Sequence, residues 1–207
     1  MTETQAPIRY VALGDSYTIG TSVAPTDRFP NQLVEALRVE SIHLELVANL
    51  GVNGFTTADL IREELPALDR HRPDLVTVLI GVNDVVQGVD IGRYEANVGT
   101  ILDDLTARLP STRIVSVAIP DYTVTPAGSA YGDPRQQHDG IVASNSVMVR
   151  LTAARGIVYV DTFDLSLGAA TDRSLVADDG LHPSGRQYAA WVTRIAPAVA
   201  RLLAPES

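Results

Sequence analysis

Four short stretches of the sequence contain residue types that together could carry out nucleophilic catalysis by a serine. Ser16 is the first candidate, Gly51 or Gly54 and then Asn83 lie in two later turns, and Asp179 and His182 stand close together near the C-terminus. A serine nucleophile needs a base, a group that orients the base, and donors that stabilise the oxyanion. The sequence supplies a candidate for each of these roles.

The first stretch places Ser16 directly after an apolar run. Ile8 to Leu13 is mostly apolar and ends abruptly in Gly14-Asp15-Ser16, which predicts a buried strand running into a tight turn. A serine at the carboxyl end of a parallel strand stands at the crevice where open α/β sheets bind ligands. We therefore expect Ser16 at the binding edge of the sheet, and Asp15 as a scaffold residue that bonds the turn.

The second and third stretches contain candidate oxyanion donors. Gly51 and Gly54 follow a predicted strand, where they could serve a helix-entry loop with positive φ or bring a backbone N–H close to a reacting oxygen. Asn83 follows the next strand, and its side chain could either bond a turn or donate its amide N–H to an oxyanion. Taken alone, each stretch leaves both interpretations open.

The fourth stretch is Asp178-Asp179-Gly180-Leu181-His182-Pro183-Ser184. Pro183 and Ser184 are explained by the start of a final helix. A turn at Gly180 and Leu181 could fold the Asp179 carboxylate back onto the His182 imidazole, which would fix its tautomer and stabilise the imidazolium. This pair is the candidate base with its orienting group.

A long loop follows the fourth predicted strand, between Pro120 and Pro134, and is rich in Pro, Gly and Tyr. Long ordered loops in compact domains are commonly functional, so this loop is the candidate wall of a substrate pocket. Tyr122 and Tyr131 could line an acyl or alcohol site, and a plain surface loop is an equally good interpretation. His138, at the start of the next helical pattern, is expected to be solvated.

Strand and helix patterns alternate along the whole chain. The predicted strands are Ile8–Leu13, His43–Ala48, Leu75–Ile80, Arg113–Ala118 and Val158–Val160. Helices are predicted at about Phe29–Val39, Thr57–Leu68, Ile91–Leu109 and Gln137–Ala154, with a last one from Ser184 to Leu203. Alternation of this kind predicts a mainly parallel five-stranded sheet with helices on both faces. We expect a flavodoxin-like three-layer α/β/α sandwich, in one domain over residues 1–207.

Composition excludes several classes of function. With 16 Lys and Arg against 25 Asp and Glu, the net charge of -9 argues against a nucleic-acid partner, which would need clustered cations. The absence of cysteine excludes disulfides and thiolate sites, and the four histidines show no ligand spacing, so no metal is expected. The N-terminus has no signal-peptide pattern and no run is long enough for a membrane span, so we expect a cytoplasmic protein. A processed secreted form would look the same.

In combination, the motifs resemble the four conserved blocks of the SGNH (GDSL-type) hydrolases. The matching residues, in the order of the family's blocks, are Gly14-Asp15-Ser16, Gly54, Gly81-Val82-Asn83-Asp84 and Asp179-Gly180-Leu181-His182-Pro183. Tyr17 stands where a leucine gave the family its label. The resemblance implies an esterase or lipase-like acylhydrolase with a flavodoxin-like fold and no metal or cofactor.

The resemblance also assigns roles to individual residues. Ser16 matches the nucleophile, His182 the base and Asp179 its partner. The backbone N–H groups of Ser16 and Gly54 and the side chain of Asn83 match the oxyanion hole. Gly54 is preferred to Gly51 because the family usually has an Asn-x-x-x-x-Gly spacing, which here begins at Asn49.

The expected substrate is a small or short-chain ester. An acyltransferase or a deacetylase acting on a sugar or lipid alcohol could use the same site. A non-catalytic flavodoxin-like binding module would need neither Asn83 nor His182. A nucleotide-binding protein would need a glycine-rich phosphate loop, which the sequence lacks. The sequence carries no expectation for oligomeric state.

Overall fold

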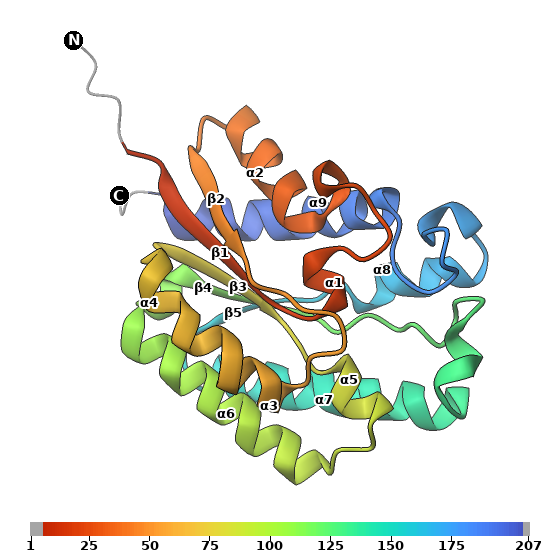
Figure 1. The fold of residues 1–207 in the computed structure, drawn as a ribbon. Coiled ribbons are helices and arrows are strands. Elements are labelled where there is room, and N and C mark those ends of the chain that lie inside the picture. The colour runs from red at the N-terminus through yellow and green to blue at the C-terminus, as the bar shows by residue number, and fades with distance from the viewer. Residues whose placement is uncertain (1–5, 205–207) are drawn as a thin grey trace.

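A parallel β-sheet forms the centre of the computed structural model, which describes residues 6–204 (Figure 1). Its five strands have the order β2-β1-β3-β4-β5 and pair in parallel throughout. They are β1 (Ile8–Gly14), β2 (Leu44–Asn49), β3 (Leu75–Leu79), β4 (Ile114–Val117) and β5 (Val158–Val160). This strand order is that of flavodoxin-like sheets, and it confirms the predicted fold class.

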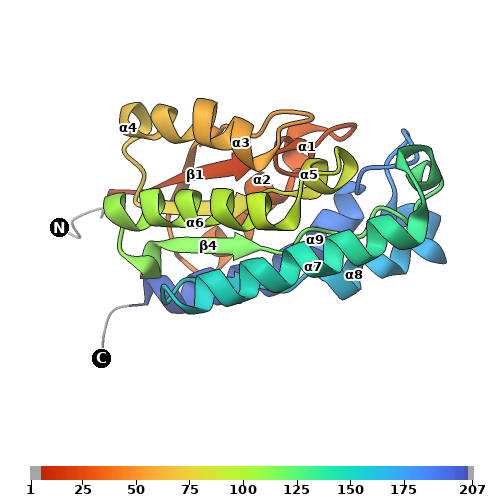
Figure 2. The same ribbon diagram turned by 90° about the horizontal axis from the view of Figure 1, so that it is seen from below.

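Helices cover both faces of the sheet. On one face, α2 (Phe29–Val39) packs against α9 (Gly185–Leu203). On the other, α6 (Ile91–Arg108) lies beside α7 (Pro134–Ala153), with the segment 57–71 next to α6 (Figures 1 and 2). Within residues 6–204, no helix is both long enough and apolar enough to cross a bilayer.

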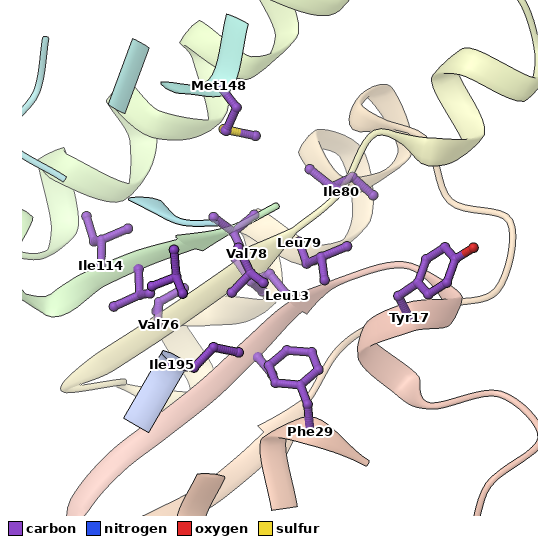
Figure 3. Close-up of a cluster of buried hydrophobic side chains, with 14 of the residues drawn as sticks. Leu13, Tyr17, Phe29, Val76, Val78, Leu79, Ile80, Ile114, Met148 and Ile195 are labelled. Atoms are coloured by element: carbon purple, nitrogen blue, oxygen red, sulfur yellow. The ribbon is translucent and has the colours of Figure 1, made fainter. Parts of the chain in front are cut away.

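The core lies on both sides of the central strands. All five residues of β3 are buried, as expected for a strand covered on two faces. In Figure 3, Met148 of α7 lies on one side of the sheet, while Phe29 of α2 and Ile195 of α9 lie on the other. The two hydrophobic layers hold the strands in place, so that the loops after the strands start from a rigid edge.

The segment 57–71 differs from the single helix that the sequence predicts. It consists of α3 (Thr57–Asp59), a π-helical turn η2 (Leu60–Glu64), a 3₁₀ turn η3 (Leu65–Ala67) and α4 (Leu68–His71). Pro66 has no N–H to donate to the preceding turn, so a regular α-helix cannot continue through it. The wider π turn leaves the Glu64 side chain buried, where it accepts a hydrogen bond from the N–H of Gly14 at 2.8 Å.

Three short helices follow strands and have no counterpart in the sequence-based expectation. They are α1 (Ser16–Ile19), α5 (Val82–Val86) and α8 (Phe163–Leu167). The structure also has 3₁₀ turns at Pro25–Asp27 (η1), Ser111–Arg113 (η4), Gly128–Tyr131 (η5), Gly168–Ala170 (η6) and Arg173–Leu175 (η7). Elements of three to five residues are too short to show a hydrophobic period.

α7 starts earlier than the apolar spacing predicts. This helix begins at Pro134 rather than at Gln137, and Asp133 caps it by accepting the N–H of Gln136 at 3.0 Å. Proline at the first helical position has its φ preset for the helix and loses no hydrogen bond there. The capping pattern, rather than the apolar spacing, marks this helix start.

Candidate active site

A cavity of about 210 Å³ lies beyond the carboxyl ends of the central strands. Its lining residues are Ser16, Tyr17, Asn53, Gly54, Val82, Asn83, Val86, Tyr122, Tyr131, Leu181 and His182. Six residues that the sequence analysis selected are therefore brought together from separate loops. Asp179, the seventh, lies against His182.

Ser16 begins α1, immediately after a tightly packed turn. Gly14 has φ 146°, and a Cβ there would lie 2.0 Å from the carbonyl oxygen of Leu79. Asp15 caps α1, because its Oδ1 accepts the N–H of Tyr17 at 2.9 Å. Asp15 has the scaffold role that was expected of it, and Ser16 is held between two fixed neighbours.

Two buried carboxyl groups lie at this turn. Burial raises the pKa of Asp15 to about 8, although a hydrogen bond from Tyr17 lowers it. Burial likewise raises the pKa of Glu64 to about 9, against the hydrogen bond from Gly14. Burial thus favours the neutral form of both groups, which support the turn before Ser16.

The pair of Asp179 and His182 has the geometry expected of a base with its orienting group. Nδ1 of His182 lies 2.6 Å from Oδ2 of Asp179. Oδ1 of Asp179 accepts the N–H groups of Leu181 at 2.9 Å and of His182 at 3.0 Å. Gly180, with φ 75°, makes this turn possible. With Nδ1 donating to the carboxylate, Nε2 of a neutral imidazole is free to accept a proton.

The carboxylate of Asp179 is kept ionised by its hydrogen bonds. Partial burial by itself would raise its pKa, but hydrogen bonds from Ser22, from His182 and from two backbone N–H groups together hold the pKa well below its ordinary value. The group is consequently charged at neutral pH and can stabilise an imidazolium at His182.

The imidazole of His182 is also supported by packing. The ring of buried Tyr17 lies 5.5 Å from it, centroid to centroid, and Trp191 lies 6.4 Å behind Tyr17. The carbonyl of His182 accepts the N–H of Ala177 at 2.8 Å, in a small antiparallel bridge that fixes the loop. Tyr17, the residue after Ser16, thus packs against the imidazole.

Gly54 and Asn83 lie on another side of the cavity. Nδ2 of Asn83 donates to the carbonyl of Phe55 at 2.9 Å, which uses one of its two hydrogens. Gly54, with φ 81°, is exposed and lines the cavity. Gly51 is buried, its N–H donates to Asn49 at 3.2 Å, and a Cβ there would lie 2.8 Å from the carbonyl oxygen of Asp15. Gly51 is a packing residue, whereas the backbone of Gly54 borders the cavity.

Asp84 joins the two loops that carry Gly54 and Asn83. Its carboxylate accepts the N–H of Thr57 at 2.8 Å and the hydroxyl of Thr57 at 2.5 Å. Burial raises the pKa of Asp84, against these two hydrogen bonds. The start of α3 is therefore fixed to α5, and Gly54 keeps its place relative to Asn83.

The loop after β4 forms one wall of the cavity, and Tyr122 and Tyr131 line it, as the sequence suggested. Tyr122 is buried and donates its hydroxyl to Gln137 at 2.6 Å. Tyr131 is 42% exposed and packs edge-on against Tyr122, with ring centroids 5.9 Å apart. The N–H of Ala127 donates to Gly180 at 2.9 Å, which connects this wall to the turn of Asp179 and His182.

His138 is not simply solvated, as the sequence suggested. Its Nδ1 lies 2.6 Å from Oδ2 of buried Asp121, and the side chain keeps 42% of its exposure. The first turns of α7 bring His138 against the loop after β4. A single sequence holds no signal for such a contact between an isolated histidine and an aspartate in a loop.

Sequence reasoning missed several residues of this region. Val82, Val86 and Leu181 line the cavity, and Asn53 borders it beside Gly54. Ser22 donates its hydroxyl to Asp179 at 2.6 Å. The apolar residues lie in or next to the motifs, which is a signal that could have found them. Ser22 belongs to no motif, so the sequence offers no such signal for it.

Comparison with known proteins adds independent findings. The model of the GDSL-like Lipase/Acylhydrolase family matches residues 12–190. An arylesterase of Vibrio mimicus is 33% identical over 84 residues, which make up 41% of this chain and 42% of that protein. The match to that curated relative thus spans less than half of its length.

Solved structures have the same fold. A lipase/acylhydrolase from Enterococcus faecalis superposes with a TM-score of 0.77 at 20% identity, over 97% of this chain and 99% of that one. TesA superposes with a TM-score of 0.74 at 19% identity, over 94% of this chain and 99% of that one. The acetyl xylan esterase AlAXEase superposes with a TM-score of 0.74 at 18% identity, over 93% of this chain and 100% of that one. Because the family match covers most of the chain, from β1 into α9, this protein belongs to the GDSL-like lipase/acylhydrolase family.

Proposed function

We propose that this protein hydrolyses small, short-chain carboxylic esters through an acyl-enzyme formed on Ser16. The observation that carries the proposal is the shared cavity. Ser16, Gly54, Asn83 and His182 line it together, and Asp179 bonds to His182 at 2.6 Å. This set contains a nucleophile, a base with its orienting group, and oxyanion donors.

In the first half-reaction, Nε2 of His182 takes the proton of the Ser16 hydroxyl while its oxygen attacks the ester carbonyl. The tetrahedral oxyanion accepts hydrogen bonds from the N–H groups of Ser16 and Gly54 and from the side chain of Asn83. Asp179 keeps the imidazole in the correct tautomer and stabilises its charged form.

The first half-reaction ends when His182 gives this proton to the leaving alcohol and the bond between the carbonyl carbon and the alcohol oxygen breaks, which leaves the acyl-enzyme. Water then enters, gives a proton to His182 and attacks the acyl-enzyme. Collapse of the second tetrahedral intermediate releases the acid and restores the Ser16 hydroxyl.

The cavity supports a short acyl group. Its volume of about 210 Å³ lies below the roughly 300–1,000 Å³ of pockets that hold drug-sized ligands. Apolar side chains, namely Val82, Val86 and Leu181, line it beside the reacting groups. Relatives described as an arylesterase and as an acetyl xylan esterase are consistent with small ester substrates.

The test is hydrolysis of nitrophenyl esters from acetate to a long-chain acyl group. We expect the highest kcat/KM with short chains, and a loss of about 10⁴- to 10⁶-fold in Ser16→Ala at an unchanged melting temperature. A fluorophosphonate should label the wild type at Ser16 and leave Ser16→Ala unlabelled. Product analysis with added alcohols measures transfer against hydrolysis.

The outcomes separate the alternatives clearly. Full activity in a folded Ser16→Ala variant would refute the proposed nucleophile. A long-chain optimum would refute the short-chain assignment. Ester products formed with the added alcohols in preference to free acid would identify a transferase.

A further inference from the structure

A serine outside the family's motifs contacts the carboxylate of Asp179. Ser22 lies in the loop after α1 and donates its hydroxyl to Oδ2 of Asp179 at 2.6 Å. This is the same oxygen that lies 2.6 Å from Nδ1 of His182. The other oxygen, Oδ1, is already held by the backbone N–H groups of Leu181 and His182.

The backbone of Ser22 is in a conformation that serine rarely adopts. Its φ is 64°, in the left-handed region, where glycine is favoured. Gly20, two residues earlier, has φ 70° in the same loop. Strained backbone that persists at one position is a reason to look for a function of its side chain. The side chain of Ser22 makes a hydrogen bond to Asp179.

The loop fixes Ser22 relative to the nucleophile. The carbonyl of Ser16 accepts the N–H groups of Gly20 at 3.0 Å and of Thr21 at 3.1 Å. The hydroxyl of Thr21 donates to the side chain of Asn53, beside the candidate oxyanion glycine. One short segment therefore connects the candidate nucleophile, the oxyanion loop and the acid.

We propose that Ser22 is a positioning residue that orients the Asp179 carboxylate toward His182, an inference that rests on the proposed function. The side chain of Asp179 is 29% exposed, so water can compete for Oδ2. The Ser22 hydroxyl occupies one direction of approach to this oxygen and leaves the other to His182. Both carboxylate oxygens are then fixed, and the imidazole keeps one orientation. The low pKa of Asp179 agrees with this, since Ser22 is among the donors that lower it.

Two variants separate the hydroxyl from the backbone. Ser22→Gly removes the donor and relieves the positive φ, and Ser22→Asn keeps a donor in a residue that tolerates this conformation. Ser41 provides a matched control, because it is also exposed and has φ 63°. Ser41→Gly makes the same backbone change just after the end of α2.

For Ser22→Gly we expect kcat to fall about 10-fold at unchanged KM, the size expected for loss of one charge-assisted hydrogen bond. Without Ser22, the Asp179 oxygen is more negative and holds the imidazolium proton more tightly. The acidic limb of the pH profile of kcat/KM should therefore move to higher pH, by about half a unit. Tyr188, whose pKa Asp179 raises, and Tyr17, which packs against His182, are unchanged in every variant. Ser22→Asn should recover most of kcat, and Ser41→Gly should match the wild type.

Wild-type kcat and pH profile in Ser22→Gly would overturn the inference. So would a lower kcat with an unmoved acidic limb and no recovery in Ser22→Asn, because that pattern would assign Ser22 a structural role in the loop. Failure of the proposed function is distinguishable, since it would show as activity retained in Ser16→Ala. The rate of fluorophosphonate labelling against pH gives a second readout that needs no ester substrate.

Discussion

Gly54 is the residue at which backbone conformation and proposed chemistry meet most directly. Its φ of 81° belongs to the left-handed region, yet a Cβ at this position would meet no atom within 4 Å. Space is therefore not the reason for glycine here. The reason is the orientation of the backbone, which determines where the N–H of Gly54 points relative to the cavity.

Gly88 provides a matched control for a substitution at Gly54. Gly88 also has a positive φ, 67°, and open space for a Cβ, but it does not line the cavity. Gly54→Ala keeps the N–H but disfavours the backbone angle that orients it, so kcat should fall, by at most the about 100- to 1000-fold expected for loss of one oxyanion donor. Gly88→Ala should keep its kcat. Both variants should lose about 1 kcal/mol of stability from the backbone strain. Ester kinetics and thermal melts measure both effects, and equal kcat in the two variants would contradict the role of Gly54.

Among the elements, the π-helical turn η2 has a consequence for stability. It places Glu64 in a buried position under the turn before Ser16, with Oε2 bonded to the N–H of Gly14. Within residues 6–204, Oε1 has no hydrogen-bond partner. The carboxyl group therefore prefers its neutral form, and burial raises its pKa from 4.5 to about 9.

The sign of the pH dependence follows from this shift. Between pH 4.5 and about 9 the folded state binds the Glu64 proton more strongly than the unfolded chain does. The free energy of unfolding consequently decreases as pH rises through this window. Asp15, whose pKa is raised to about 8, acts in the same direction.

Glu64→Gln should flatten this dependence, because glutamine keeps the shape and the acceptor for Gly14 but cannot ionise. The difference in free energy of unfolding between Glu64→Gln and the wild type should shift in favour of the variant by on the order of 1–3 kcal/mol from pH 5 to pH 9. Urea unfolding at both pH values measures the effect. The neighbouring Glu63→Gln, whose side chain is 54% exposed, is the control and should follow the wild type. Parallel curves for wild type and Glu64→Gln would contradict a buried neutral Glu64.

At the scale of the whole molecule, Trp191 connects the helical layer to the active-site edge. This fully buried side chain of α9 packs against Phe29 of α2 at 6.5 Å, Tyr188 at 5.1 Å and Tyr17 at 6.4 Å between ring centroids. Tyr17 in turn packs against His182. The core of this face of the sheet therefore supports the candidate base from behind.

Trp191→Ala should destabilise the fold by about 3–5 kcal/mol, because it leaves a large cavity in a packed core. Trp191→Phe keeps most of the volume and should cost less. Denaturant unfolding followed by circular dichroism measures both, since Trp191 is the single tryptophan of the chain and its fluorescence is lost in the variants. A cost below about 1 kcal/mol in Trp191→Ala would contradict this packing role.

The long elements could be predicted because their signals are local. The apolar runs of β1, β3 and β4 and the helical spacing of α2, α6 and α9 locate these elements to within one or two residues. The segment 57–71 and α1, α5 and α8 could not be found in this way. Their conformations depend on Pro66, on single turns and on contacts with other parts of the chain.

The sequence by itself determined the βα alternation, and with it the edge at which Ser16, Gly54, Asn83 and His182 gather, because the carboxyl ends of parallel strands lie on one side of the sheet. It also contained the Asp179 and His182 turn, whose hydrogen bonds span three residues. Only the tertiary structure decided that Glu64 lies under Gly14 and that Ser22 meets Asp179, 157 residues away. The physical reason is that hydrogen bonds between distant segments form only once packing has fixed both partners, and they leave no periodicity or spacing in the sequence.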